Sequence, residues 1–385
     1  MTYILKDSVS TVSREKEWFF IPSRRSWSPV VNNEMSFDNV KYSLKNQSSY
    51  LRQTIDNISI NNQIADLFRS IEEDDSKMGE FTKRMRAVFR SFDTFSTAFD
   101  GSRRFIEYCM NDGNSTRHRV DFLGDGLGSV MYIIGAIMVT SPTGAPIVID
   151  EPELSLHPLA QRRLCEQLGD LARTTQIILA THNPYFVNWK FIENGAQVNR
   201  LTKPSHEGTR INHLESYSTY KELIKGGNWE QPFMMDEISK EIFFEDNILF
   251  TEGQTDVGLL RSESSLSPDI NIFGYGVRGC EKFPIALKMA KDLGLQKVVV
   301  LVDGDVDIRK VKRWRRDYPE YRVVQWDKTD IHDKYESIPR VNDGVIIKVK
   351  KADGYFTKNG KKKKDKELGD YYEKIKEINE YFEKS

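Results

Sequence analysis

Residues 146–158 read PIVIDEPELSLHP, and this stretch decides the fold class of the N-terminal half of the chain. Four apolar residues predict a buried strand, and Asp150 and Glu151 follow it side by side. In a parallel sheet covered by helices, ligands bind at the carboxyl edge of the strands, where both acids would lie. One carboxylate there can hold hydrated magnesium while its neighbour activates a water. Taken alone, a DE pair is more often the cap of the next helix.

Outward from this stretch, strands and helices alternate. The alternation predicts an α/β domain with a mainly parallel sheet covered by helices. Glu17–Pro22 predicts a further short strand, and the polar helical pattern at about residues 35–95 indicates an inserted helical arm. The other predicted elements are the strands 117–122, 146–149 and 176–180, a helix after Gly126 and a helix from His157.

A second alternation starts at Asn247 and predicts a smaller α/β domain. We therefore expect one domain over residues 1–215, a linker over 216–240 and a second domain over 241–385. The lysine-rich stretch 360–366 is not expected to pack, which would give the second domain a basic tail. The predicted elements of the second domain are the strands 248–251, 270–275, 297–302 and 322–326, the helix 282–293 and a basic helix after residue 307.

The bulk composition suits a two-domain protein without disulfides. A chain of 385 residues that is 39% apolar can bury two cores. The three cysteines lie far apart with no CxxC pair, which favours a reducing compartment over a zinc or disulfide framework. The longest apolar run, Val130–Val139, is about half of a membrane span, and no signal peptide precedes the first strand. We therefore expect a cytoplasmic protein with no membrane partner.

Basic residues gather in two runs although the net charge is only −1. Six lie within residues 309–316, and nine lysines face two aspartates over 348–366. Such runs suit phosphate, so a nucleic acid is the expected partner. The alternative is a solvated helix face followed by a disordered tail, and for the tail this alternative has at least equal weight. The candidate nucleic-acid contacts are Arg309, Arg313, Arg315, Arg316 and Lys350.

A second motif strengthens the ATPase interpretation of the first domain. Residues 180–184 read ATHNP and follow another apolar strand. The histidine of this motif, His182, lies thirty-one residues after Glu151. With PIVIDEPELSLHP, this resembles the ABC-type ATPases of the SMC and OLD groups. The resemblance implies that Asp150 holds magnesium, Glu151 activates water and His182 senses the γ-phosphate. It also implies that the LSLHP segment contacts a second subunit.

Residues 123–129, LGDGLGS, lie where those ATPases carry their signature loop. Glycines that open a helix let backbone N–H groups and the helix dipole meet a phosphate. The resemblance implies that Gly126 and Gly128 contact ATP bound to the opposing subunit, and hence a homodimer or higher oligomer. The loop departs from the usual pattern at Gly124, where many relatives have serine.

The sequence contains no GxxxxGK[ST], the loop that cradles the phosphates of a bound nucleotide. Family members carry this loop near their start, and this sequence resembles the part downstream of it. Two interpretations stay open. Either the N-terminal part of the lobe lies outside this sequence, or binding in cis has been lost. In the second case Asp150 and Glu151 are relics, or a partner supplies the loop. ATP is therefore an open cofactor.

Two acidic motifs mark the second domain: ILFTEGQTD over 248–256 and VVVLVDGDVD over 298–307. Alternate residues of an extended strand end point the same way, so Asp303 and Asp305 can converge on one ion. With Glu252 opposite, they would form an acidic pocket for Mg²⁺ or Mn²⁺, hard ions that prefer oxygen ligands. For an isolated DGD, a tight turn whose aspartates bond their own backbone is the simpler explanation.

The pair of motifs resembles the Toprim domain, and an ABC-type ATPase followed by Toprim resembles the OLD nucleases. The resemblance implies metal binding by Asp303 and Asp305, with Glu252 a ligand or a general acid/base and Asp256 serving a second ion. It implies a metal-dependent DNA endonuclease gated by an ATPase dimer, in anti-phage defence with a defence-system partner. The alternative function is a non-catalytic nucleic-acid-binding or assembly module that uses a degenerate ATPase lobe as a dimer scaffold.

Overall fold

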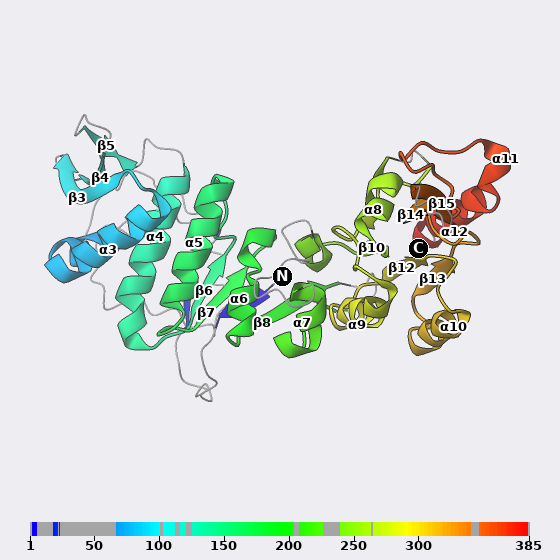
Figure 1. Cartoon of the computed structure of the whole chain (residues 1–385). Coiled ribbons are helices and arrows are strands. Elements are labelled where there is room, and N and C mark those ends of the chain that lie inside the picture. The colour runs from blue at the N-terminus through cyan, green and yellow to red at the C-terminus, as the bar shows by residue number, and fades with distance from the viewer. Residues whose placement is uncertain are drawn as a thin grey trace. The chain divides into compact units, whose positions relative to one another are not determined.

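The chain folds into two compact units, Met1–Asn199 and Arg200–Ser385, in a computed structural model (Figure 1). We expected the division within residues 216–240. Helix α7 (Tyr217–Lys225) occupies the first part of that stretch and buries Tyr220 and Leu223, so this part belongs to the second unit. The structure describes residues 2–5, 18–21, 23, 67–100, 103–111, 116–120, 125–203, 208–225, 239–262, 265–339 and 346–383.

The largest sheet has the strand order β2-β6-β7-β1-β8-β9. Strands β6 and β7 are parallel, as predicted, and β2 is parallel to β6, whereas β1 runs antiparallel to both β7 and β8. The parallel prediction came from the alternation over residues 117–180, and β1, β8 and β9 lie outside it. The bounds are β1 Thr2–Leu5, β2 Phe19–Ile21, β6 Ile147–Asp150, β7 Ile177–Ala180, β8 Gln197–Thr202 and β9 Arg210–His213.

Two long helices of the first unit confirm the predicted helices after Gly126 and from His157. Helix α4 spans Asp125–Thr140, and helix α5 spans Pro158–Leu171. Helix α5 starts there because the His157 ring accepts a hydrogen bond from the Leu159 N–H at 3.3 Å, and Pro158 needs no backbone donor in the first turn. The short segments that follow are η4 Pro184–Phe186 and α6 Trp189–Glu193.

Helix α4 also bears on the membrane question. Within the described residues, Gly126–Thr143 is the one helical segment long and apolar enough to cross a bilayer, and 56% of it is buried inside the structure. Ile133, Ile134 and Ile137 are fully buried. The core helix of a soluble protein has these properties.

A three-stranded antiparallel sheet stands where the sequence predicted the end of a helical arm. Helix α3 (Asp75–Val88) confirms part of the arm, and residues 35–66 lie outside the described residues. The sheet has the order β3-β4-β5, so the strand predicted at 117–122 is not part of the parallel sheet. Phe92 and Phe95 pack against Phe81 with ring centroids 6.2 and 5.1 Å apart. The bounds are β3 Phe92–Asp100, β4 Arg103–Met110 and β5 Arg117–Arg119.

The second unit has strands where the sequence predicted them, and they form a fully parallel sheet of order β11-β10-β12-β13. Almost every residue of β12 is buried, which is typical of a strand covered on both faces. Leu249, Val299 and Val324 share one core with α8 and α12, while α9 contacts β12 and α10 contacts β13. The bounds are β10 Asn247–Phe250, β11 Asn271–Ile272, β12 Lys297–Val302, β13 Arg322–Gln325, α8 Gln254–Arg261, α9 Phe283–Asp292 and α10 Ile308–Asp317.

The C-terminal stretch is packed, and the prediction of a basic tail is wrong. Strands β14 (Lys334–Pro339) and β15 (Ile346–Ala352) form an antiparallel pair. After them come α11 (Asp365–Leu368) and α12 (Tyr371–Glu383). Helix α12 buries the apolar residues that recur on one helical face, Ile375, Ile378 and Phe382. The lysine-rich composition hid this helix because the apolar positions begin only after the lysines.

Candidate functional site

The DE pair lies at the carboxyl end of β6, as predicted. Asp150 is in register with Ala180 on the neighbouring parallel strand β7. The Glu151 N–H donates to the Ala180 carbonyl oxygen at 2.8 Å, and Glu151 adopts a left-handed φ of 45°. A non-glycine residue in this region is strained, and such strain gathers at functional positions.

His182 follows β7 and faces the same edge. Its Nε2 lies 3.7 Å from Glu151 Oε1, and its side chain is 77% exposed. The structure therefore brings together Asp150, Glu151 and His182, the three residues that the sequence assigned to one site. The site is open to solvent, as a nucleotide-binding edge would be.

Glu153 is a member of this site that the sequence analysis missed. Its Oε1 accepts hydrogen bonds from the Thr181 hydroxyl at 2.6 Å and from the His182 N–H at 3.0 Å. Burial raises the pKa of Glu153, and within the described residues its Oε2 is buried without a hydrogen-bond partner. The carboxylate therefore ties the loop after β6 to the turn that carries His182. The signal in the sequence was a third acid two residues after the DE pair.

The glycines of the predicted signature loop have a visible packing role. A Cβ on Gly126 would lie 2.5 Å from the Ser155 carbonyl oxygen, so only glycine lets the start of α4 approach this loop. Ser155 itself has a φ of 63°. Gly128 is buried in the first turns of α4, and Gly124 lies outside the described residues. Their contact with a nucleotide phosphate stays a prediction.

In the second unit, the predicted acids gather at the carboxyl edge of the parallel sheet. Glu252 follows β10, and Asp303 follows the adjacent strand β12. Asp256, in the first turn of α8, accepts a hydrogen bond from the Gly253 N–H at 2.8 Å. Asp305 is exposed at the rim, whereas Asp303 is 9% exposed. We call Glu252, Asp256, Asp303, Asp305 and Asp330 the acid pocket.

The acids of the pocket raise one another's pKa. Burial, and after it the negative charges of Asp256 and Asp330, raise the pKa of Asp303 to about 8. Burial, opposed by the Gly253 hydrogen bond and aided by the charge of Asp330, raises the pKa of Asp256 to about 6. Burial and the charge of Asp305 raise the pKa of Glu252. Carboxylates that disfavour each other's ionisation in this way are typical of functional sites.

Asp330 is an acid of the pocket that lies outside the two acidic motifs. It is 4% exposed and pairs with the Lys334 ammonium, and its Oδ1 lies 3.0 Å from His332 Nδ1. Its charge raises the pKa of Glu252 as well as those of Asp256 and Asp303. The sequence alone could not assign Asp330 to the pocket, because α10 and β13 lie between it and the second motif.

The DGD turn is held by packing as well as by its acids. A Cβ on Gly304 would lie 2.3 Å from the Lys328 carbonyl oxygen, to which the Gly304 N–H donates at 2.9 Å. Gln325 Nε2 donates to the Val306 carbonyl oxygen at 2.8 Å. The backbone of this turn is thus satisfied without the aspartate side chains, which leaves the carboxylates for other partners.

The donor chemistry of the acid pocket fits a hard divalent cation, since all its side chains offer carboxylate oxygens. Among the described residues, no three His, Cys, Asp or Glu side chains converge closely enough to hold an ion as they stand. Asp256 is turned to Gly253, and Asp330 to Lys334 and His332. Binding of an ion would therefore require rotation of these side chains.

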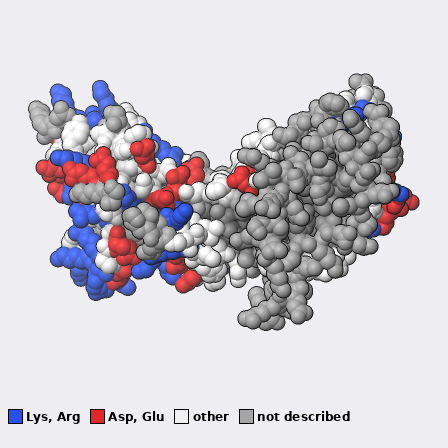
Figure 2. Space-filling model, turned by 180° about the vertical axis from the view of Figure 1, so that it is seen from behind, with Lys and Arg blue, Asp and Glu red and all other residues white. Residues whose placement is uncertain are grey.

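The predicted nucleic-acid contacts on α10 are exposed but largely paired. Arg309 donates to Asp307 at 2.6 Å, and Arg316 donates to Asp317 at 2.8 Å. Arg313 also lies 3.4 Å from Asp317. Arg315 donates to the Val323 carbonyl oxygen at 2.8 Å, and Lys350 pairs with Asp333 at 3.1 Å. Figure 2 shows Asp and Glu side chains interspersed among Lys and Arg on the face of this unit turned to the viewer.

Comparison with known proteins supports the ATPase interpretation of the first unit. Residues 16–188 match the family described as "AAA domain, putative AbiEii toxin, Type IV TA system". The first unit therefore carries an ATPase-type domain, and the match ends just beyond His182. No curated protein matches the chain.

Several solved structures of SMC heads are similar to part of the chain. The SMC head domain from Thermotoga maritima is 15% identical, with a TM-score of 0.28, and the match covers 40% of this chain and 52% of that one. A Smc head domain with an extended coiled coil, derived from Pyrococcus furiosus and bound to the C-terminal domain of ScpA, is 11% identical with a TM-score of 0.32, over 46% and 44% of the two chains. Scores this low carry no argument for the present chain.

Proposed function

We propose that this chain is a divalent-metal-dependent nuclease of the OLD type, in which the acid pocket cuts nucleic acid and the ATPase domain gates the cut. The observation that supports the proposal best is the mutual repulsion of buried acids at the carboxyl edge of a parallel sheet. Buried carboxylates are costly unless they are protonated or neutralised by a cation. Mg²⁺ or Mn²⁺ would remove that cost, as expected for the Toprim metal site that the two motifs resemble.

In this proposal Glu252, Asp303 and Asp305 hold the first ion, and Asp256 serves a second. A bound ion supplies stabilisation of the negative charge that develops on the attacking water and the leaving oxygen. The alternative role of Glu252 is that of a general acid/base, and burial and the charge of Asp305 raise the pKa of its carboxyl. Lys334 lies close enough to lower the pKa of Asp303 and offers an ammonium to a phosphate oxygen.

The ATPase domain has the role of a gate in the proposal. Glu153 joins the loop after β6 to His182, so a second subunit that contacts residues 154–157 would influence the histidine directly. We propose a homodimer in which ATP holds two such domains together once a phosphate-binding loop, which this sequence does not contain, is supplied. The family name of the match mentions a toxin, which agrees with a role in anti-phage defence, with a partner or nucleic-acid trigger.

Cleavage of DNA tests the proposal. The chain is incubated with plasmid DNA and Mg²⁺ or Mn²⁺, and nicked and linear products are separated on a gel. We expect metal-dependent nicking that EDTA abolishes, because the charge on the reacting oxygens then lacks a counter-ion. Asp307→Asn is the matched control, since Asp307 caps α10 two residues beyond Asp305 and points to Arg309. Equal cutting with and without EDTA would exclude the proposal.

A further inference from the structure

The lysine-rich stretch that follows β15 is an ordered loop. We call Thr357–Lys364 the lysine loop. The Thr357 N–H donates to the Lys361 carbonyl oxygen at 2.8 Å, and the Gly360 N–H donates to the Thr357 carbonyl oxygen at 2.9 Å. Gly360 has a φ of 75°, which glycine adopts without strain. The loop thus presents its lysines from a fixed backbone, and fewer degrees of freedom are lost when it binds a partner.

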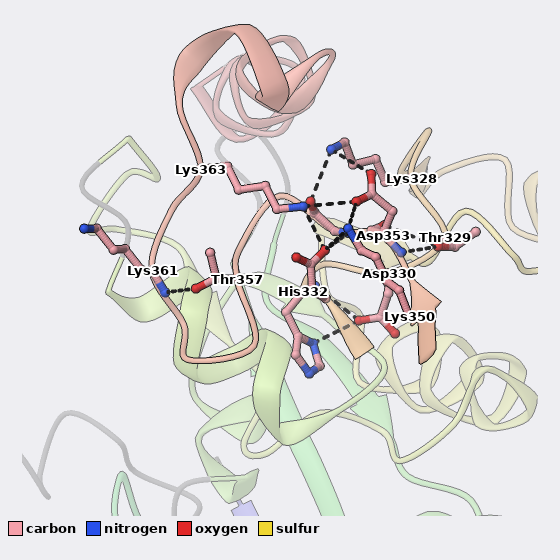
Figure 3. Close-up of polar contacts among 11 residues, drawn as sticks. Lys328, Thr329, Asp330, His332, Lys350, Asp353, Thr357, Lys361 and Lys363 are labelled. Atoms are coloured by element: carbon pink, nitrogen blue, oxygen red, sulfur yellow. Dashed lines mark hydrogen bonds and ion pairs between the residues drawn. The ribbon is translucent and has the colours of Figure 1, made fainter. Parts of the chain in front are cut away.

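Its lysines fall into two groups. Lys363 is tethered: its ammonium donates to Asp333 at 2.8 Å and to Asp353 at 3.1 Å, and its side chain is 9% exposed (Figure 3). Figure 3 shows the side chain of Lys361 extended away from this network. Lys358, Lys361 and Lys364 are exposed, and no described carboxylate pairs with them.

The absence of described carboxylate partners distinguishes Lys358, Lys361 and Lys364 from the arginines of α10, the other basic surface of the unit. The guanidinium groups of Arg309, Arg313 and Arg316 already have carboxylate partners. A phosphate that binds them must displace an acid, whereas a phosphate that binds Lys358 or Lys361 displaces only water and counter-ions. Because counter-ion release drives binding to nucleic acids, the unpaired lysines should gain more from it.

An aromatic surface adjoins the loop. The Lys362 ammonium lies 5.2 Å from the ring centroid of Tyr372 and 5.9 Å from that of Tyr371. Tyr371 is buried, whereas Tyr372 is 43% exposed. An exposed ring beside lysines is the combination that holds single-stranded nucleic acid, because bases stack on the ring while the phosphates meet the lysines.

The residues just before the lysine loop are hydrogen-bonded to the segment that follows Asp330 of the acid pocket. The Tyr355 N–H donates to the Ile331 carbonyl oxygen at 2.9 Å, and the Asp333 N–H donates to the Phe356 carbonyl oxygen at 2.9 Å. Asp330, one residue before Ile331, belongs to the acid pocket. A nucleic-acid strand bound to the lysine loop would therefore lie next to the segment that carries Asp330.

We infer that the lysine loop and Tyr372 form the docking surface for a nucleic-acid single strand, and that this surface contributes more to binding than α10 does. The inference rests on the proposed function, since it names the surface that brings the substrate to the acid pocket. It assigns a binding role to Lys358, Lys361 and Lys364 by charge, and to Tyr372 by stacking.

Two triple variants of the full chain that each lose three positive charges test the inference. One is Lys358→Ala with Lys361→Ala and Lys364→Ala. The other is Arg309→Ala with Arg313→Ala and Arg316→Ala. Binding of a labelled single-stranded DNA oligonucleotide is measured by fluorescence anisotropy in EDTA over a salt series. We expect the loop variant to bind about tenfold more weakly and to lose about 2 from the slope of log K against log salt, with a smaller change for the α10 variant.

Tyr372→Ala and Tyr372→Phe separate stacking from charge. Phenylalanine keeps the ring, so Tyr372→Phe should bind like the parent, while Tyr372→Ala should weaken single-stranded DNA more than duplex DNA. Equal losses in the two triple variants would overturn the inference, as would a loop variant that binds like the parent, or a parent that binds phosphatidylserine vesicles but no oligonucleotide. Binding that follows the loop without any metal-dependent cutting would overturn the nuclease proposal alone.

Discussion

Both acidic sites of this chain follow apolar strands, yet their carboxylates differ in exposure to solvent. At the edge of β6, Glu151 is 34% exposed and His182 77% exposed, so water screens their charges. In the acid pocket, Asp303 and Asp330 are nearly inaccessible, and burial together with the charges of Asp256 and Asp330 raises the pKa of Asp303. The same sequence pattern, acids after an apolar strand, therefore gives an exposed site in one unit and a cluster of partly buried acids in the other. Burial makes the difference.

The largest expected effect is on cleavage, and it should separate the two sites. Asp303→Asn removes a buried oxygen ligand, so metal-dependent nicking of plasmid DNA should fall on the order of 100-fold or more. Asp150→Asn, at the other site, should leave nicking in the absence of ATP within about twofold of the parent. Gel assays of initial rates measure both. If Asp150→Asn abolishes nicking without ATP, the two sites are not independent.

The next effect concerns stability against pH without metal. The pKa of Asp303 is raised to about 8 and that of Asp256 to about 6, so the folded chain binds more protons than the unfolded chain above about pH 4. Stability should therefore fall as pH rises from about 4 to 8, by about 1.4 kcal/mol per pH unit for each proton involved.

Urea unfolding of the second unit at several pH values in EDTA measures this fall. Asp303→Asn should flatten it, because the amide does not ionise, and saturating Mn²⁺ should flatten it in the parent. Asp307→Asn, whose carboxylate has its pKa lowered by Arg309, serves as the control and should keep the fall. A parent whose stability does not change over this range would show that the acids do not repel one another when folded.

A smaller effect is expected at the edge of β6. Glu153→Ala leaves the Thr181 hydroxyl and the His182 N–H without their acceptor, which should cost about 1–3 kcal/mol locally. Hydrogen–deuterium exchange should quicken at residues 181–183 and in the loop 153–157 together. Glu153→Gln keeps an acceptor oxygen and should exchange more slowly than Glu153→Ala. Faster exchange confined to residues 181–183 would show that the loop and the turn are not coupled.

The smallest effect is expected for nucleotide binding by the isolated chain. The described part of the ATPase edge offers two carboxylates and a histidine, and these cannot replace a backbone nest and lysine around a triphosphate. Titration of labelled ATP with Mg²⁺ should show weak binding or none. Tight, saturable binding would reveal a phosphate-binding loop that the sequence analysis did not identify.

The sequence by itself determined the local features of this protein. Apolar runs predicted β6, β7, β10 and β12, and the acids after three of these runs placed Asp150, Glu252 and Asp303 at strand ends, because strand patterns lie in consecutive residues. It also predicted helices α4 and α5, whose starts carry a glycine and a proline. The prediction of an unpacked basic tail was wrong because it relied on the lysine-rich composition before α12 and not on the apolar pattern within that helix.

Only the tertiary structure decided which residues meet. Asp330 joins the acid pocket, and Glu153 joins His182, through contacts between segments that are distant in the sequence. Charge and burial depend on all neighbours in space, so a linear pattern can name a carboxylate but cannot fix whether water, a lysine or another carboxylate lies against it.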